Sequence, residues 1–375
     1  MQSVSSPANS RSSTRQSNIE LLRIIVMVMI LGCHFATHGK FQFDSQTITI
    51  SRLWWNFLEM GGNFGVVVFV LISGYFLIEN DTLLIKPKKV IKLWGQIFFY
   101  SVTLFLASFL LGKGIPAPLN LVKAVFPITF DQWWFASTYF VLYLLHPYLN
   151  RALRSFSKKE YQRLLVLLIL IWSVIPTFTA TAFQSNPLLE FVLFYSIAGY
   201  IRLFGLSHLF SCKKWCALWL IFSALTYLSS VVFLFMGTKL EVFSTYALYF
   251  YKRNSILVLC SAVSFFMLFL NWSIKSNRFI NRVSTATFGV YLLHDSNVLR
   301  PFLWETVFHN ASFQNTALII PYSIAVVCVV YIACTLIDLF RIHCIEKAFM
   351  KGVDAMLHRV GHPIEKLKLR LKTKV

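Results

Sequence analysis

The stretch NIELLRIIVMVMILGCHFATHGK, residues 18–40, is apolar over most of its length, yet it carries Arg23 near its start and His34 near its end. An α-helix needs about 20 apolar residues to cross the roughly 30 Å hydrocarbon core of a bilayer. Ionisable side chains are costly there, so they face the interior of a helix bundle or a wet cavity. The stretch therefore predicts a membrane helix with one polar face.

The rest of the chain has the same apolar character. Of its 375 residues, 57% are hydrophobic and 13% are charged, and 37 are Phe. Soluble domains are much less apolar, so we predict an all-α, polytopic membrane helical bundle. The ten spans expected from apolar runs of suitable length cover residues 19–38, 58–78, 91–112, 132–150, 162–183, 188–205, 215–236, 255–273, 285–303 and 317–340.

These spans divide the chain into three parts. Residues 1–18 are rich in Ser and predict a disordered cytoplasmic N-terminus. Residues 19–340 form one ten-helix membrane domain, without an internal repeat or a linker. Residues 341–375 mix Leu, Met and Val with Lys and Arg, which predicts a basic amphipathic cytoplasmic tail suited to an anionic leaflet.

The formal net charge of +20 is explained by topology. Of the 35 Lys and Arg residues, 26 fall in the segments on the side of the N-terminus, seven fall on the opposite side, and Arg23 and Arg300 lie inside spans. Cytoplasmic segments carry such an excess. The distribution predicts both termini in the cytoplasm and gives no support for nucleic-acid binding.

The polar residues of the first span share one face. At about 100° per residue, the eleven positions from Arg23 to His34 bring the helix back to within about 20° of the same direction, roughly 16 Å along the axis. His38 lies one turn beyond His34, and Glu20 precedes Arg23 by three positions, where the two can pair. This alignment favours a functional face over a lone packing histidine.

Histidine and arginine together suit a particular chemistry. A neutral imidazole can take a proton from a hydroxyl nucleophile and hand it to a leaving group. Arginine suits phosphates or a carbonyl oxygen. The pair therefore predicts a two-ended active site, with an anionic donor entering on the cytoplasmic side and a hydroxyl acceptor meeting it deeper in the membrane.

Other common chemistries find no support. The seven cysteines lie in or beside spans without CxxC spacing, and we predict no metal site. The chain has no phosphate-binding loop, HExxH motif or Gly-x-Ser-x-Gly elbow. ATP hydrolysis and soluble serine chemistry are therefore not expected.

Motifs along the chain resemble those of the acyltransferase-3 family of bacterial membrane acyltransferases. Glu20 to Arg23, followed by ten residues and then His34, resembles the Arg-x10-His signature of that family. Further similar stretches are FGVVVFVLISGYFLI from Phe64, KPKKVIKLWGQ from Lys86, WWFASTYFVLYLLHPYLNR from Trp133 and FGVYLLHD from Phe288. Two features depart from the family pattern: Val67 replaces a frequent acidic residue, and Lys88, Lys89 and Lys92 replace the usual arginines of the third span.

The resemblance implies an O-acyltransferase of the bacterial cytoplasmic (inner) membrane, with many spans. It would transfer an acetyl group from cytoplasmic acetyl-CoA to a hydroxyl of a cell-surface polysaccharide or of its lipid-linked precursor. Acetyl-CoA would be a substrate, and no cofactor would be bound permanently. By this analogy His34 and Arg23 are the catalytic residues. The partners would be the donor, the glycan and the lipid bilayer, and assembly into a homo-oligomer stays open.

We assign further candidate residues from their chemistry and position. Arg23, Lys88, Lys89 and Lys92 are predicted to bind the donor, although the lysines also serve as topology determinants. Ser73 and Tyr75 either line a donor tunnel or allow close helix packing. The ninth span crowds polar residues into one segment, either as a substrate site or as a buried network. The predicted substrate-binding residues are Glu20, His38, Ser73, Tyr75, Tyr291, His294 and Asp295.

A polysaccharide transporter or flippase is the main alternative, because intramembrane Arg and His also mark substrate and proton pathways. Transporters often contain paired repeats and broken helices, which the sequence does not indicate. A membrane glycosyltransferase or polymerase is a weaker alternative, since acidic residues do not cluster in the expected outer loops.

Overall fold

The computed structural model describes residues 15–44, 46–110, 118–206 and 209–372, with side chains as far as residue 359. These ranges are predominantly helical and contain no β-strand. The chain is a helical membrane bundle, as its composition predicts. Residues 1–14, part of the predicted disordered N-terminus, lie outside the described ranges.

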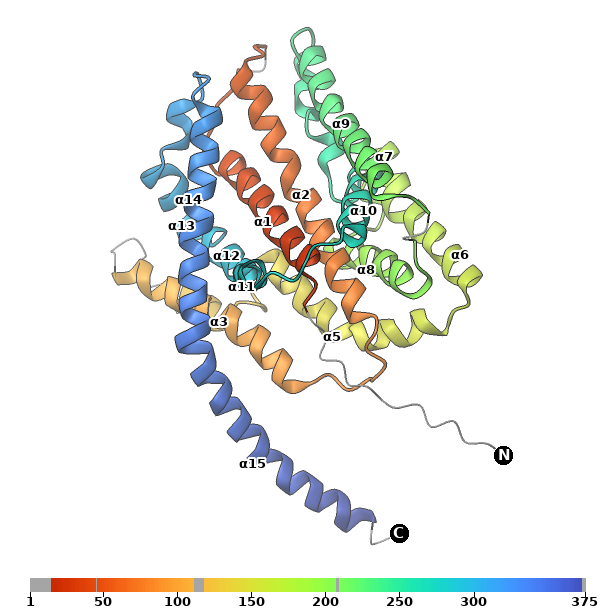
Figure 1. The fold of residues 1–375 in the computed structure, drawn as a ribbon. Helices are drawn as coiled ribbons and strands as arrows, with labels where there is room; N and C mark the ends of the chain where they lie inside the picture. Colours follow the sequence, from red (N-terminus) through yellow and green to blue (C-terminus); the bar gives the residue numbers. More distant parts are fainter. Residues whose placement is uncertain (1–14, 45, 111–117, 207–208, 373–375) are drawn as a thin grey trace.

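Figure 1 shows the arrangement of the helices. In chain order they are α1 (Ser17–Thr37), α2 (Ile50–Leu77), α3 (Pro87–Leu110), α4 (Pro118–Val125), α5 (Trp134–Ser155), α6 (Lys158–Ile169), α7 (Ile175–Thr179), α8 (Pro187–Phe204), α9 (Cys212–Gly237), α10 (Ile256–Asn271), α11 (Arg278–Val283), α12 (Thr287–His294), α13 (Leu299–Pro301), α14 (Ile319–Phe340) and α15 (Lys347–Lys372). The π-helical turns Leu170–Val174 and Arg341–Glu346 join α6 to α7 and α14 to α15.

Eight helical segments within the described ranges are long and apolar enough to cross a membrane. They correspond to eight of the ten expected spans. The expected span 132–150 is helix α5, which carries Arg151 and Arg154 in its last turns, and the expected span 285–303 is interrupted. Hydropathy alone therefore identifies the bundle but does not fix the number of crossings.

Helix starts follow local capping chemistry. The Thr49 side chain accepts from the Arg52 backbone N–H at the start of α2. Ser157 and Glu160 form a capping box on α6, and Asn186 caps α8 ahead of Pro187. Each cap satisfies backbone N–H groups that have no partner within the helix.

Helix α1 lies inside the bundle, where it contacts α2, α10, α12 and α14. Its contact with α2 depends on small residues. A Cβ atom added at Gly61 would lie 2.6 Å from the Met29 carbonyl oxygen, and one added at Gly65 would lie 2.6 Å from Ile30 Cγ1. Helices approach this closely in membranes where glycine removes the side chain. The glycines of α2 therefore set the position of the polar face of α1.

The expected ninth span breaks after His294. Helix α12 ends at His294, and the carbonyl oxygen of the capping residue Asp295 accepts from the Arg300 guanidinium at 2.9 and 3.1 Å. The Ser296 hydroxyl then accepts from the Leu299 backbone N–H at 3.0 Å. Side chains thus replace the backbone bonds that a continuous helix would make, as interrupted membrane helices require. The expectation that this chain lacks broken helices was wrong.

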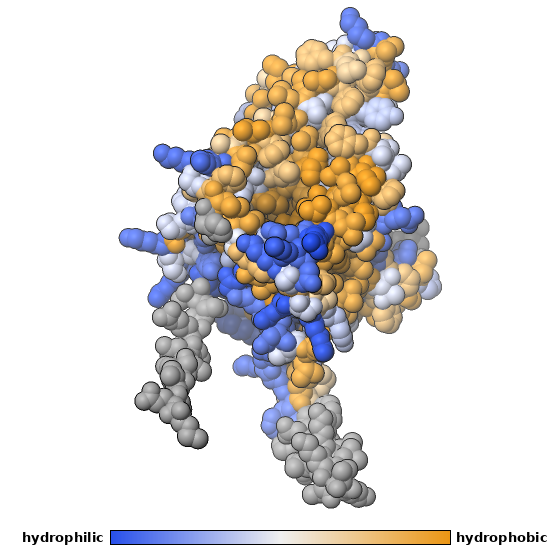
Figure 2. Space-filling view, turned by 90° about the vertical axis from the view of Figure 1, so that its right-hand side faces the viewer, coloured by the Kyte–Doolittle hydropathy of each residue, from blue (hydrophilic) through white to orange (hydrophobic). Residues whose placement is uncertain are grey.

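The predicted tail is continuous with the last membrane helix. Helix α15 extends α14 away from the bundle (Figure 1). Its first residues remain in contact with α3, and the Phe349 ring occupies the space in which Gly95 would carry a side chain. Figure 2 shows hydrophobic residues over the upper part of one face and hydrophilic side chains gathered below them. The division into membrane domain and tail at residue 341 stays a prediction.

Candidate active site

One cavity of about 840 Å³ runs beside the polar face of α1. From the start of α1 to its end, the face contributes Arg23, Met27, Ile30, His34 and His38. Near the start of α1 the cavity is lined by four cations: Arg15, Arg23, Lys92 and Arg341. Around the other end it is lined by Glu59, Asn63, Trp134, Lys252, Arg253, Asp295 and Arg300. The predicted alignment of Arg23, His34 and His38 on one cavity is confirmed.

His34 pairs with a second histidine that lies 260 residues further along the chain. His34 Nδ1 is 2.8 Å from His294 Nε2, and His294 Nδ1 is 2.6 Å from the Val290 carbonyl oxygen. A carbonyl oxygen only accepts, so the hydrogen of a neutral His294 sits on Nδ1 and its Nε2 is an acceptor. The hydrogen between the two rings therefore belongs to His34 Nδ1.

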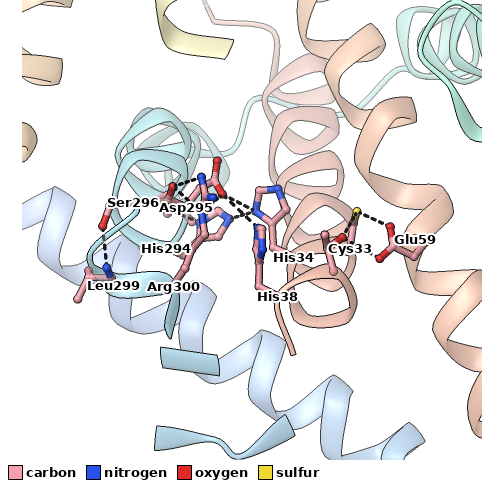
Figure 3. Close-up of polar contacts among 11 residues, drawn as sticks. Cys33, His34, His38, Glu59, His294, Asp295, Ser296, Leu299 and Arg300 are labelled. Carbon is pink, nitrogen blue, oxygen red and sulfur yellow. Dashed lines mark hydrogen bonds and ion pairs between the residues drawn. The ribbon is translucent and has the colours of Figure 1, made fainter. Parts of the chain in front are cut away.

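This arrangement leaves Nε2 of a neutral His34 with a free lone pair. Nε2 has no hydrogen-bond partner among the residues that the structure describes. In Figure 3 this second ring nitrogen is turned away from the His294 contact. An unprotonated imidazole nitrogen beside a cavity is what a general base requires.

Asp295 holds the centre of the cluster. Its Oδ1 lies 3.6 Å from His34 Nδ1, 3.6 Å from His38 Nε2 and 2.9 Å from Arg300 Nε. Only 4% of the Asp295 side chain is exposed. A buried carboxylate of this kind is stabilised by its cation partner, and it favours the positive charge that His34 acquires on taking a proton.

The same atoms raise the question of a metal. The ligand atoms of His34, His38 and Asp295 lie within 4.8 Å of one another, close enough to surround one ion. Two contacts oppose this use. Arg300 occupies the Asp295 oxygen, and His34 Nδ1 carries a hydrogen toward His294. A metal ligand must offer a free lone pair, so the contacts favour a hydrogen-bonded network.

Arg23 is held at its own end of the cavity. Its guanidinium lies 3.4 Å from Glu20 Oε2, and the same oxygen accepts from the Ser284 hydroxyl at 2.6 Å. Glu20 does not line the cavity. The arrangement favours Glu20 as a residue that positions Arg23, rather than one that contacts a substrate.

The three predicted donor-binding lysines differ in position. Lys92 lines the cavity, and its Nζ is 2.6 Å from Glu346 Oε1. Lys88 pairs with Asp354 of α15 at 2.7 Å and does not line the cavity. Lys89 is exposed and does not line it either. Only Lys92 therefore lies where a ligand in the cavity can reach it.

The remaining predicted site residues also differ in whether they line the cavity. Ser73 and Tyr291 line the cavity. The Tyr75 hydroxyl accepts from Arg202 at 2.9 Å, and Tyr75 lines a second, smaller cavity. His294 is completely buried, so its contacts favour a positioning role on His34 over direct substrate contact.

Sequence reasoning missed two sets of cavity residues. The first set is on α2, where Glu59 and Asn63 lie one turn apart within the expected span 58–78, although neither was given a role. The second set is Arg341 and Glu346, which were assigned to the tail. Arg341 Nε is 2.6 Å from the fully buried Asp338, which also accepts from the Tyr100 hydroxyl at 2.7 Å. The spacing of four between Glu59 and Asn63 was the available signal.

The family match agrees with this geometry. A family model described as an acyltransferase domain, that of the acyltransferase-3 family, matches residues 16–337. The chain belongs to the acyltransferase-3 family. The match covers the helices that form the His34 cluster and ends just before Asp338 and Arg341. No curated protein and no solved structure matched the chain. The protein is thus a membrane acyltransferase, and its donor, acceptor and orientation are matters for proposal.

Proposed function

We propose that this acyltransferase moves an acetyl group from acetyl-CoA to a hydroxyl of a cell-surface polysaccharide or of its lipid-linked precursor. The observation that carries the proposal is the free Nε2 of His34, beside a cavity whose far end is cationic. The base suits a hydroxyl acceptor, and the cations suit the phosphates of a nucleotide donor. The Arg-x10-His pattern supports the same assignment.

The cavity suits a long donor. Arg23 and His34 are separated by roughly 16 Å along α1. We assign the phosphates of CoA to the end lined by Arg15, Arg23, Lys92 and Arg341. The pantetheine arm then runs along α1, and its thioester lies beside His34. Lys88 and Lys89 take no part, because neither lines the cavity.

The transfer proceeds with His34 as base and then as acid. His34 Nε2 takes the proton of the acceptor hydroxyl, and that oxygen attacks the carbonyl carbon of the thioester. The carbon–sulfur bond breaks, the acetyl group stays on the acceptor oxygen, and the CoA thiolate takes the proton back from His34. Asp295, 3.6 Å from His34 Nδ1, stabilises the intermediate imidazolium.

We propose that the protein lies in a bacterial cytoplasmic membrane with both ends in the cytoplasm. The distribution of Lys and Arg supports this orientation. It brings the cationic end of the cavity to the cytoplasm, where acetyl-CoA is made, and the His34 end toward the outer leaflet.

A polysaccharide transporter remains the second candidate. The broken helix at His294 to Leu299 favours it, because discontinuous helices often form transporter substrate sites. The fixed tautomer of His34, which leaves Nε2 as a base beside the cavity, favours acyl transfer over transport. Measuring the acetyl groups that are covalently bound to the polysaccharide distinguishes acyl transfer from transport.

The test is the O-acetyl content of the surface polysaccharide of the host, measured by proton NMR. Cells carry no copy of the gene, the native chain or His34→Ala. Acetyl signals only with the native chain support the proposal. Equal acetylation in all three polymers, with a changed amount of exported polymer, would favour the transporter.

A further inference from the structure

Helix α2 presents two side chains with spare hydrogen-bond-accepting capacity to the cavity that His34 also lines. Glu59 and Asn63 both line the cavity, and their spacing of four places them on one helix face about 6 Å apart. Neither residue takes part in the hydrogen-bond network of His34, His294 and Asp295.

Glu59 has spare accepting capacity. Its two oxygens accept from the Thr37 hydroxyl at 2.7 Å and from the Cys33 thiol at 3.4 Å. Glu59 makes no ion pair within the described ranges. A carboxylate offers about four lone-pair sites, and a thiol is a weak donor. An unpaired acid at this depth is costly unless a ligand or water supplies donors.

The orientation of Asn63 is fixed by its neighbour. Its Nδ2 donates to the Tyr251 carbonyl oxygen at 3.0 Å. The amide oxygen then faces away from that bond, and it has no partner among the described residues. Asn63 is half-buried beside the cavity, so this oxygen is a second free acceptor.

Glu59 is bonded to the segment of α1 that carries His34. Cys33 and Thr37, which bond to Glu59, lie immediately before His34 and three residues after it on α1. Figure 3 shows Glu59 and Cys33 on one side of α1 and the Asp295 cluster on the other. Glu59, Asn63 and His34 line the same cavity, so a molecule that brings a hydroxyl to His34 Nε2 lies in a cavity that these two acceptors also face.

We infer that Glu59 and Asn63 form the acceptor subsite, in which they accept hydrogen bonds from two hydroxyl groups of an uncharged sugar ring. The inference rests on the proposed function. Hydroxyl groups donate well to a carboxylate, and such charge-assisted bonds are the stronger kind. A sugar carboxylate in direct contact with Glu59 would be repelled, although the cations Lys252 and Arg253 also line the cavity. At the Glu59 position the subsite thus orients a neutral sugar residue so that a further hydroxyl reaches His34.

The test uses the purified full chain in detergent, with acetyl-CoA and the surface polysaccharide of the host after mild-base removal of its ester groups. Glu59→Gln keeps the size of the side chain and removes its charge. Asn63→Leu removes the free oxygen. Glu305→Gln is the matched control, because Glu305 pairs with Lys40 at 3.8 Å and does not line the cavity.

We expect Glu59→Gln to raise the KM for polysaccharide about tenfold or more, the effect of one charge-assisted hydrogen bond. Asn63→Leu should raise it by several-fold. The KM for acetyl-CoA should stay at the native value in both variants. Glu59→Gln should keep the native melting temperature, whereas Asn63→Leu should melt at a lower temperature because the Tyr251 carbonyl oxygen loses its donor. Glu305→Gln should change neither KM.

Two results would overturn the subsite alone. One is an unchanged KM for polysaccharide in Glu59→Gln while the native chain transfers acetyl groups. The other is an equal rise in both KM values, which would mean that Glu59 only clamps α2 to α1. Failure of the native chain to acetylate the polymer would reject the proposed function, and the subsite with it.

Discussion

His34 Nδ1 lies 2.8 Å from His294 Nε2, and His294 Nδ1 in turn lies 2.6 Å from the Val290 carbonyl oxygen. The backbone of α12 thereby determines which nitrogen of a residue on α1 carries a hydrogen. Nε2 of His34 is therefore the base on the cavity side of the ring, and no carboxylate among the described residues is bonded directly to the imidazole.

Replacing His294 with Leu should lower kcat about 10- to 100-fold, the usual effect of removing a partner that orients a reactive group. Without the acceptor, His34 is free to adopt the other tautomer, in which Nε2 carries the hydrogen. The KM for acetyl-CoA should not change. His294→Gln, whose side-chain oxygen can accept from His34 Nδ1, should recover part of the rate. Equal kcat values for the Leu variant and the native chain would remove the positioning role.

Replacing Asp295 with Asn should lower kcat about 100-fold, since the imidazolium loses its negative neighbour. The variant should also melt at a lower temperature, because Arg300 is left without its partner. Adding Arg300→Gln should restore the melting temperature without restoring kcat. If the double variant regained activity, Asp295 would be a structural residue only.

Arg23→Lys should raise the KM for acetyl-CoA about tenfold, because a point charge replaces a planar fork at the phosphates. Lys88→Gln is the comparison. Lys88 is exposed and pairs with Asp354 outside the cavity. The KM of Lys88→Gln for acetyl-CoA should therefore stay within about twofold of the native value, because surface ion pairs contribute little. Rates of acetyl transfer at a series of acetyl-CoA concentrations give both KM values. A larger effect at Lys88 than at Arg23 would contradict the donor path along α1.

Chelators should leave the acyltransferase active. Arg300 already pairs with Oδ1 of Asp295, and the hydrogen on His34 Nδ1 points to His294. The check is acetyl transfer before and after dialysis against EDTA, together with metal analysis of the purified protein. Loss of activity that returns with one particular metal would show that His34, His38 and Asp295 bind an ion.

Periodicity was enough to predict the core of the site. Arg23, His34 and His38 share one helix face by simple geometry, and the structure lines the cavity with that face. The apolar runs likewise predicted the class of fold. Both inferences depend on residues close together in sequence, where helix geometry fixes their relation.

The rest depends on contacts between distant segments. The pairing of His34 with His294 joins α1 to α12, and no spacing rule predicts it. The bond from Lys92 to Glu346 brings the supposed tail into the cavity wall. The expected span 285–303 is interrupted at Asp295, whose carbonyl oxygen accepts from the Arg300 guanidinium. A hydropathy profile does not detect such a contact. Glu59 and Asn63 fall inside the expected span 58–78, but only the packing of α2 against α1 shows that their face lines the cavity.

The most direct test places the purified chain in sealed liposomes, with acetyl-CoA labelled in its acetyl group and ester-free polysaccharide of the host as acceptor. Native chain and His34→Ala are compared at equal amounts, after circular dichroism shows equal helix content. The account predicts labelled polysaccharide with the native chain and a loss of at least about 100-fold with His34→Ala. Equal labelling by the two proteins would contradict the role of His34 as the base.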